Sequence, residues 1–240
     1  MAKRSRPSPG KCVHCLSNDV ARTWDHVFPK SWYPETTPPN LYKWQIPSCL
    51  TCNQEYGVLE ADLLLRFGMC IDPQLPAAAG ILEKIRKFYK PEFAKDERDG
   101  RARAALKKKL LKELIPGSEI RKDAVYPGMG ERWRRSDDEA AGIRISADNI
   151  HRLTEKIVRG IYFIEDGKFV ELPYVIEFHA LTENGAAGFK ELLDRFGSKY
   201  DRGPGIVVRR AVTPDDNMSS VFEIVIWDQV KMYASVRQPH

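Results

Sequence analysis

Two pairs of cysteines constrain this chain more than any other feature of its sequence. Each pair has the spacing Cys-x-x-Cys: Cys12 with Cys15, and Cys49 with Cys52. Two cysteines three positions apart present two thiolates to one ion, and two such pairs complete the tetrahedral site that zinc prefers. The sequence therefore predicts a structural zinc site made by these four cysteines. The 33 residues between Cys15 and Cys49 would form a loop with a task of its own.

Disulfides and a thioredoxin-like redox pair are the alternatives to zinc. Disulfides need an oxidising compartment, and residues 1–10 are basic and rich in Pro and Ser, without the apolar segment of a signal peptide. A redox pair would lie beside a βαβ pattern, which is absent around residues 12–52. Zinc is therefore favoured, and Cys70, in an apolar run, is expected in the core. No apolar run approaches the about 20 residues of a membrane span, so we expect a cytoplasmic protein without membrane contact.

Three residues that could carry chemistry lie in or just after this loop: Asp25, His26 and Asn53. Adjacent side chains on a strand point to opposite faces, so Asp25 and His26 would need an irregular backbone to meet at one site. Pro29 is consistent with a strand that ends there. Asn53 stands where a helical pattern begins, and an asparagine at that place is usually a cap. Taken singly, each residue has a structural explanation.

Taken together, these residues resemble a known family. The order Cys-x-x-Cys, Asp-His-Val-x-Pro-Lys, Cys-x-x-Cys-Asn, within residues 10–65, is similar to the zinc-bearing branch of the HNH endonucleases. The resemblance implies a ββα-metal core, in which a hairpin and a helix surround one divalent cation. It implies that His26 is the general base and that Asp25 and Asn53 hold Mg²⁺ or Mn²⁺. The implied activity is hydrolysis of DNA phosphodiester bonds, with RNA not excluded as a substrate.

General chemistry agrees with these roles. An imidazole can take a proton from water near neutral pH, and a hard cation takes carboxylate and amide oxygens as ligands. Glu60 follows Asn53 by two helical turns on the same face, so it could approach the cation. A surface or structural role for Glu60 is favoured over that one.

The chain departs from the family pattern at one position. The family usually has an asparagine a few residues before the second cysteine pair, and the spacing places that position near Trp44. The nearest preceding asparagine is Asn40. Either Asn40 acts across a longer loop, or the backbone and the packing of Trp44 take its place.

Basic residues suggest a nucleic-acid partner. The candidate phosphate contacts in the loop are Lys11, Arg22, Lys30 and Lys43. Residues 83–122 hold 14 Lys and Arg against 7 Asp and Glu, and such a segment suits a polyanion because each neutralised phosphate releases counterions. A solvated amphipathic helix explains this segment equally well. The alternative function is a zinc-stabilised nucleic-acid-binding module without catalysis, and a homodimer is compatible with either function.

The predicted fold class is α+β. We expect a basic flexible arm at 1–10, a zinc-bound HNH core at 11–75, a basic helical segment at 76–122, a linker or long loop at 123–145, and a mixed helix and antiparallel-sheet domain of unknown role at 146–240. Apolar spacing predicts helices at 77–89, 102–114 and 186–196, and one that begins near Ser146, with a break at 96–100. A hairpin is expected around 165–167. Further strands are expected at 174–180, 206–211, 220–227 and 229–236.

Overall fold

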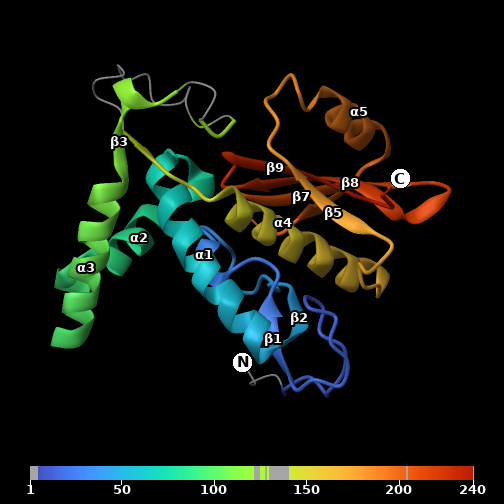
Figure 1. The fold of residues 1–240 in the computed structure, drawn as a ribbon, viewed down its shortest axis with the longest axis horizontal. Helices are drawn as coiled ribbons and strands as arrows, with labels where there is room; N and C mark the ends of the chain where they lie inside the picture. The colour runs from blue at the N-terminus through green and yellow to red at the C-terminus, as the bar shows by residue number, and fades with distance from the viewer. Residues whose placement is uncertain (1–4, 122–124, 128, 130–140, 204, 240) are drawn as a thin grey trace.

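The computed structural model describes residues 5–121, 125–127, 129, 141–203 and 205–239. Within these residues the fold is mixed α+β, with five α-helices and antiparallel sheets (Figure 1). The first four residues of the expected basic arm and most of the expected linker at 123–145 lie outside the described part. No helix in the described ranges has the length and apolar character needed to cross a membrane.

The N-terminal part is a hairpin followed by a long helix. Strand β1 (Arg22–His26) pairs antiparallel with β2 (Gln45–Cys49), and α1 (Leu50–Cys70) begins directly after β2. Cys49 is the N-cap of α1, and its sulfur accepts the backbone N–H of Cys52, which satisfies one of the unpaired donors of the first turn. Residues 11–70, which contain both cysteine pairs, are called the cysteine-held unit below.

Helix α2 (Ile81–Tyr89) packs against α1, and α3 (Glu97–Glu113) packs against α2 (Figure 1). The predicted break at 96–100 is wrong, because Asp96 is the N-cap of α3 and accepts the N–H of Asp99 at 2.7 Å. Gly100 therefore lies inside the helix. The predicted start of α2 at 77 is also early, since Ala77 lies in a 3-10 turn (Pro76–Ala78). A short pair of strands, β3 (Leu114–Pro116) and β4 (Ala141–Ile143), was not predicted.

The C-terminal part begins with α4 (Ala147–Ile161), capped by Ser146 as expected. It continues into a five-stranded antiparallel sheet in the order β5-β9-β8-β7-β6. The strands are β5 (Val175–His179), β6 (Ser198–Asp201), β7 (Ile206–Thr213), β8 (Asp216–Ile226) and β9 (Val230–Arg237). Helix α5 (Ala187–Phe196) connects β5 to β6. The four predicted strands and the helix at 186–196 are confirmed, and β6 was missed.

The hairpin predicted around residues 165–167 is wrong. The chain instead leaves α4 through a π-helical turn (Tyr162–Asp166), which ends at Gly167 with φ 65°. Tyr162 is fully buried and its ring lies 5.9 Å from that of Phe222. The short apolar run therefore extends the buried face of a helix, which periodicity alone could not distinguish from a strand.

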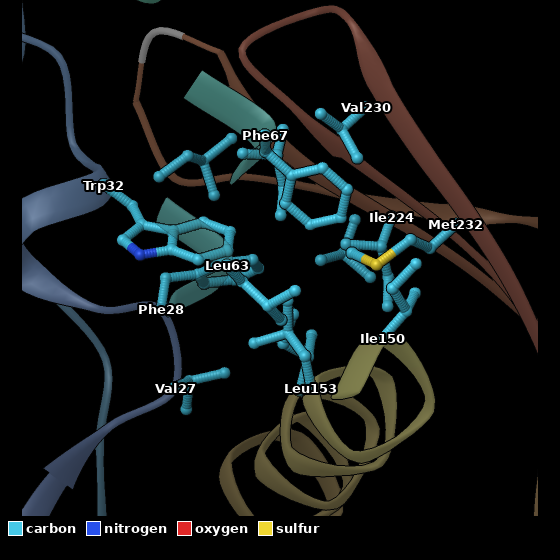
Figure 2. Packing of buried hydrophobic residues seen from close by; sticks show 14 of the residues in the cluster. Val27, Phe28, Trp32, Leu63, Phe67, Ile150, Leu153, Ile224, Val230 and Met232 are labelled. Atoms are coloured by element: carbon cyan, nitrogen blue, oxygen red, sulfur yellow. The ribbon is translucent and has the colours of Figure 1, made fainter. Parts of the chain in front are cut away.

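One hydrophobic core joins the two ends of the chain. Met232 of β9 contacts Thr154 of α4, while the next residue, Tyr233, packs on Phe189 of α5. The two helices therefore cover opposite faces of the sheet (Figure 1). Figure 2 shows core side chains from the cysteine-held unit, α4 and the sheet packed together. The core is continuous from the hairpin to the sheet, and α4 lies between them.

Candidate functional site

The four cysteines converge at the base of the hairpin. The sulfur atoms of Cys12, Cys15, Cys49 and Cys52 all lie within 4.8 Å of one another. Backbone N–H groups point at two of them: that of Cys49 donates to the Cys12 sulfur at 3.3 Å, and that of Cys52 donates to the Cys49 sulfur at 3.4 Å. Four thiol groups in this arrangement could hold a metal ion such as zinc.

Asp25 is buried between β1 and two partners from elsewhere in the chain. Its side chain has 6% exposure. One carboxylate oxygen accepts a hydrogen bond from Nε2 of His14 at 2.9 Å, and the other lies 3.0 Å from the Lys156 ammonium. Burial opposes ionisation of Asp25, but the bond from His14 and the charge of Lys156 lower its pKa below the usual value. Asp25 is therefore a carboxylate with both oxygens engaged.

Lys156 reaches this place from α4, which lies 131 residues further along the chain. Its side chain is fully buried and also forms an ion pair with Glu60 of α1. The ammonium lies 5.3 Å from the centre of the Tyr56 ring. Burial raises the pKa of Glu60 to about 7, although the Lys156 ammonium opposes this shift. His14, Asp25, Glu60 and Lys156 are called the buried charge cluster below.

His26 faces away from this cluster. It follows Asp25 on a regular strand, and its cross-strand partner is Gln45. The side-chain amide of Gln45 donates to Nε2 of His26 at 2.9 Å, so the second ring nitrogen carries the proton. Burial, followed by the charge of Lys30, lowers the pKa of His26 to about 4. The imidazole is therefore neutral at physiological pH.

Asn53 lies in the first turn of α1, but it is not the cap, because Cys49 has that role. Its amide nitrogen donates to the Thr23 hydroxyl at 2.8 Å and to the Trp24 carbonyl at 3.4 Å. These bonds hold the start of α1 against β1. Thr23 and Asp25 share one face of β1, because side chains alternate along a strand.

The three residues predicted to act together are therefore arranged differently from that expectation. Asp25 and the partner of Asn53 lie on the helix-facing side of β1, while His26 lies on the opposite side. Both oxygens of Asp25 already bond to protein groups. In this arrangement Asp25 and Asn53 do not fit a divalent cation held between them. The regular backbone of β1 explains why the pair Asp25-His26 does not converge.

Trp44 occupies the region where the family has its middle asparagine. Trp44 is 3% exposed, and its carbonyl accepts the N–H of Val27 at 3.0 Å, which extends the hairpin beyond β1. The guanidinium of Arg202 stacks 3.8 Å from the ring centre. Asn40 is exposed. Of the two explanations open from the sequence, backbone pairing and packing of Trp44 is the one these contacts favour.

The predicted phosphate contacts differ in their surroundings. Lys11 pairs with Glu171, and the Arg22 guanidinium donates to the carbonyls of Ser8 at 2.7 Å and Lys11 at 3.1 Å. The Lys43 ammonium lies 4.9 Å from the centre of the Tyr33 ring. Lys30 is exposed at the end of the segment that carries His26. Lys30 is therefore the best placed of the four to meet a phosphate in solvent.

His14 and Lys156 are the two residues of the buried charge cluster that the sequence did not reveal. His14 lies inside the first Cys-x-x-Cys pair, where a histidine is a signal that could have been noted. Lys156 lies next to Ile157 on the apolar face of α4, and a lysine on a buried helical stripe is unusual. Neither position reveals its partner, because the contacts join residues far apart in the chain.

Comparisons with known proteins gave no relatives. No family model matches the chain, and neither a curated protein nor a solved structure matches it.

Proposed function

We propose that this protein is an endonuclease of the HNH type that hydrolyses DNA phosphodiester bonds, with RNA as a further substrate to be tested. The proposal is carried by one observation: four cysteines gather a hairpin and a helix that carry Asp25-His26 and Asn53 in the order of the family motif. We propose zinc as the ion among the four sulfurs, where it stabilises the unit without taking part in the chemistry.

In this proposal His26 is the general base. Its imidazole is neutral at physiological pH, with a pKa lowered to about 4 by burial, so its protonation state suits a base, although this low pKa also makes it a weaker one. The Gln45 amide covers the accepting nitrogen at 2.9 Å and must rotate away before that nitrogen can meet a water molecule. The exposed ammonium of Lys30 would contact the substrate phosphate nearby.

The family resemblance also proposes Mg²⁺ or Mn²⁺ at Asp25 and Asn53, where such an ion would supply Lewis-acid polarisation of the phosphate. The contacts of Asp25 exclude that ion as long as Lys156 and His14 hold its two oxygens. No catalytic step is therefore assigned to the ion in this arrangement.

A second candidate function is a nucleic-acid-binding module without catalysis. It is favoured by the engagement of all three motif residues: Asp25 with His14 and Lys156, His26 with Gln45, and Asn53 with β1. A binding module needs the fold and the basic residues but has no use for a general base.

A plasmid-nicking assay with Mg²⁺ or Mn²⁺ separates these functions. We expect the wild type to nick DNA and His26→Ala to lose cleavage while it still binds DNA in a gel-shift assay, because binding energy comes mostly from basic residues on phosphates. His179→Ala is the matched control, since His179 bonds to Ser235 within the distant sheet. Equal cleavage by His26→Ala would exclude His26 as the base. DNA binding by a wild type that cuts neither DNA nor RNA would instead identify the binding module.

A further inference from the structure

Lys156 has the surroundings of a bound metal ion. Its ammonium is fully buried, and carboxylate oxygens of Asp25 and Glu60 contact it from β1 and α1. A buried lysine is rarely found without such pairing, because removing an ammonium from water costs several kcal/mol or more. The two carboxylates thus form a cation site that a side chain from another part of the fold already fills.

We propose that Lys156 is the resident cation of the cysteine-held unit, and that its ammonium and a divalent metal ion exclude each other at Asp25 and Glu60. This inference deepens the proposed function. It rests on that function only for the role that a metal ion at Asp25 and Glu60 would have in cleavage. The mutual exclusion of the ammonium and a metal ion can be tested by measuring ion binding in the absence of nucleic acid.

The distances explain the exclusion. The Lys156 nitrogen lies 3.0 Å from Asp25 Oδ1, whereas Mg²⁺ requires its oxygen ligands at about 2.0–2.1 Å in octahedral geometry. A metal ion bound to that oxygen would therefore overlap the ammonium or force it away. The second oxygen of Asp25 accepts from His14, so it does not offer an alternative ligand position.

The charges of Asp25, Glu60 and Lys156 also favour mutual exclusion of the ammonium and a metal ion. Asp25 and Glu60 contribute two negative charges when ionised, and Lys156 contributes one positive charge. His14 donates to the second oxygen of Asp25 and lies on the side away from the Lys156 ammonium. Without Lys156 the two carboxylates would face each other across a buried space, an arrangement that a divalent cation would neutralise. The ring of Tyr56, contacted from outside by Arg152 at 5.7 Å, closes one side of that space.

The lysine also connects this site to the rest of the fold. Lys156 belongs to α4, which packs on the sheet through Thr154 and Met232. Gly160, one turn later, approaches Val27 of the hairpin. Ion binding by the cysteine-held unit is thereby under the control of a helix that belongs to the C-terminal part of the chain.

The test measures Mn²⁺ binding by electron paramagnetic resonance on the full chain with its cysteine site loaded with zinc. The variants are Lys156→Met, which keeps the unbranched apolar part of the side chain and removes the ammonium, and the double variant Lys156→Met/Asp25→Asn. Lys231→Met is the matched control, because Lys231 pairs with a surface carboxylate, Glu183, that a second lysine also holds.

We expect Lys156→Met to bind Mn²⁺ at least about tenfold more tightly than the wild type, since a unit positive charge at contact distance is removed from the site. The double variant and Lys231→Met should bind no better than the wild type. Equal affinity of Lys156→Met and the wild type would overturn the proposal. So would tight Mn²⁺ binding by the double variant, because Asp25 would then not be a ligand.

Thermal unfolding keeps the proposal testable if Lys156→Met is unstable. Without divalent metal beyond the zinc, this variant should melt at a lower temperature than the wild type, because two buried carboxylates lose their partner. Millimolar Mn²⁺ should raise the melting temperature of the variant and leave that of the wild type unchanged. A variant that Mn²⁺ does not stabilise would contradict the proposal. Failure of the wild type to cut DNA would leave these results intact and would concern the proposed function alone.

Discussion

The cysteine-held unit and the C-terminal sheet both bury charged side chains, but they do so in different ways. In the sheet, Glu223 accepts from the Tyr233 hydroxyl at 3.0 Å and pairs with Arg209 at 3.3 Å, and these partners lie on neighbouring strands. In the cysteine-held unit, Asp25 pairs with Lys156, which comes from a distant helix. These two partners of Glu223 follow from strand register, whereas Lys156 reaches Asp25 only because α4 packs against the hairpin.

The two regions also differ in what holds their strands. Strands β7 to β9 run for eight to eleven residues and pair with each other along most of that length. The hairpin of β1 and β2 has only five residues a strand, and an isolated two-stranded hairpin is at best marginally stable in water. The hairpin has fewer strand pairs than the sheet, so it depends more on its contacts with α1 and α4 and on the group of four sulfurs at its base.

The largest expected effect comes from the loss of one of the four clustered cysteines, on which only the cysteine-held unit depends. Cys49→Ser should abolish the proposed zinc binding and unfold the hairpin, because a structural zinc site contributes on the order of 10 kcal/mol to folding. Zinc content by atomic emission and the melting temperature by circular dichroism check this result. Cys70→Ser is the control, since Cys70 lies at the end of α1 and outside the four-sulfur group. An unchanged melting temperature in Cys49→Ser would show that the unit does not rely on its ion.

The second largest effect is the pH dependence of stability that the buried Glu60 should cause. Glu60 has a pKa raised from 4.5 to about 7, so between these values the folded chain holds a proton that the unfolded chain has released. The contribution of Glu60 to the free energy of unfolding therefore falls as pH rises through this window, by about 3 kcal/mol in total. Urea unfolding at pH 5 and pH 7 should reveal that loss in the wild type and a smaller one in Glu60→Gln.

Glu183→Gln is the surface counterpart of this experiment. Glu183 is ion-paired with Lys190 and Lys231, and hydrogen bonds from these lysines lower its pKa to about 2. Its charge therefore does not change between pH 5 and pH 7, and the variant should keep the pH dependence of the wild type. Identical pH dependence in Glu60→Gln and the wild type would contradict the assignment of the shift to the buried charge cluster.

The smallest expected effects come from alanine substitutions at two helical glycines. A Cβ added to Gly160 of α4 would lie 2.7 Å from Val27 Cγ2, whereas one added to Gly57 of α1 meets no atom within 4 Å. Gly160→Ala should cost about 1–3 kcal/mol through overpacking at the contact between α4 and the hairpin. Gly57→Ala should gain about 0.5–1 kcal/mol, because alanine is the better helix former. Chemical denaturation of both variants checks the signs, and two gains would mean that α4 and the hairpin are loosely packed.

Parts of this fold could be predicted because their signals are local. Ser146 marks the start of α4, and the alternating residues of β7 to β9 define strands. The errors also have local causes. The charged residues after Asp96 resemble a loop although they open α3, and the apolar residues after Ile161 resemble a strand although they continue a helix.

In the candidate site, too, only the features that depend on neighbours in the sequence could be predicted. The gathering of Cys12, Cys15, Cys49 and Cys52 could be predicted, because the spacing of each pair presents its sulfurs together. The opposite faces of Asp25 and His26 also follow from strand geometry, which the regular backbone of β1 confirms. The partners of these residues could not be predicted, since Gln45 and Lys156 depend on register and on helix packing.

The sequence by itself determined that four thiols would meet and that a strand would carry an acid beside an imidazole, because both depend on neighbours within a few residues. Only the tertiary structure decided that the acid meets a lysine from α4. That contact depends on a core shared between the hairpin, α1 and the sheet, and hydrophobic burial, which is non-directional, brings together residues that no local pattern relates.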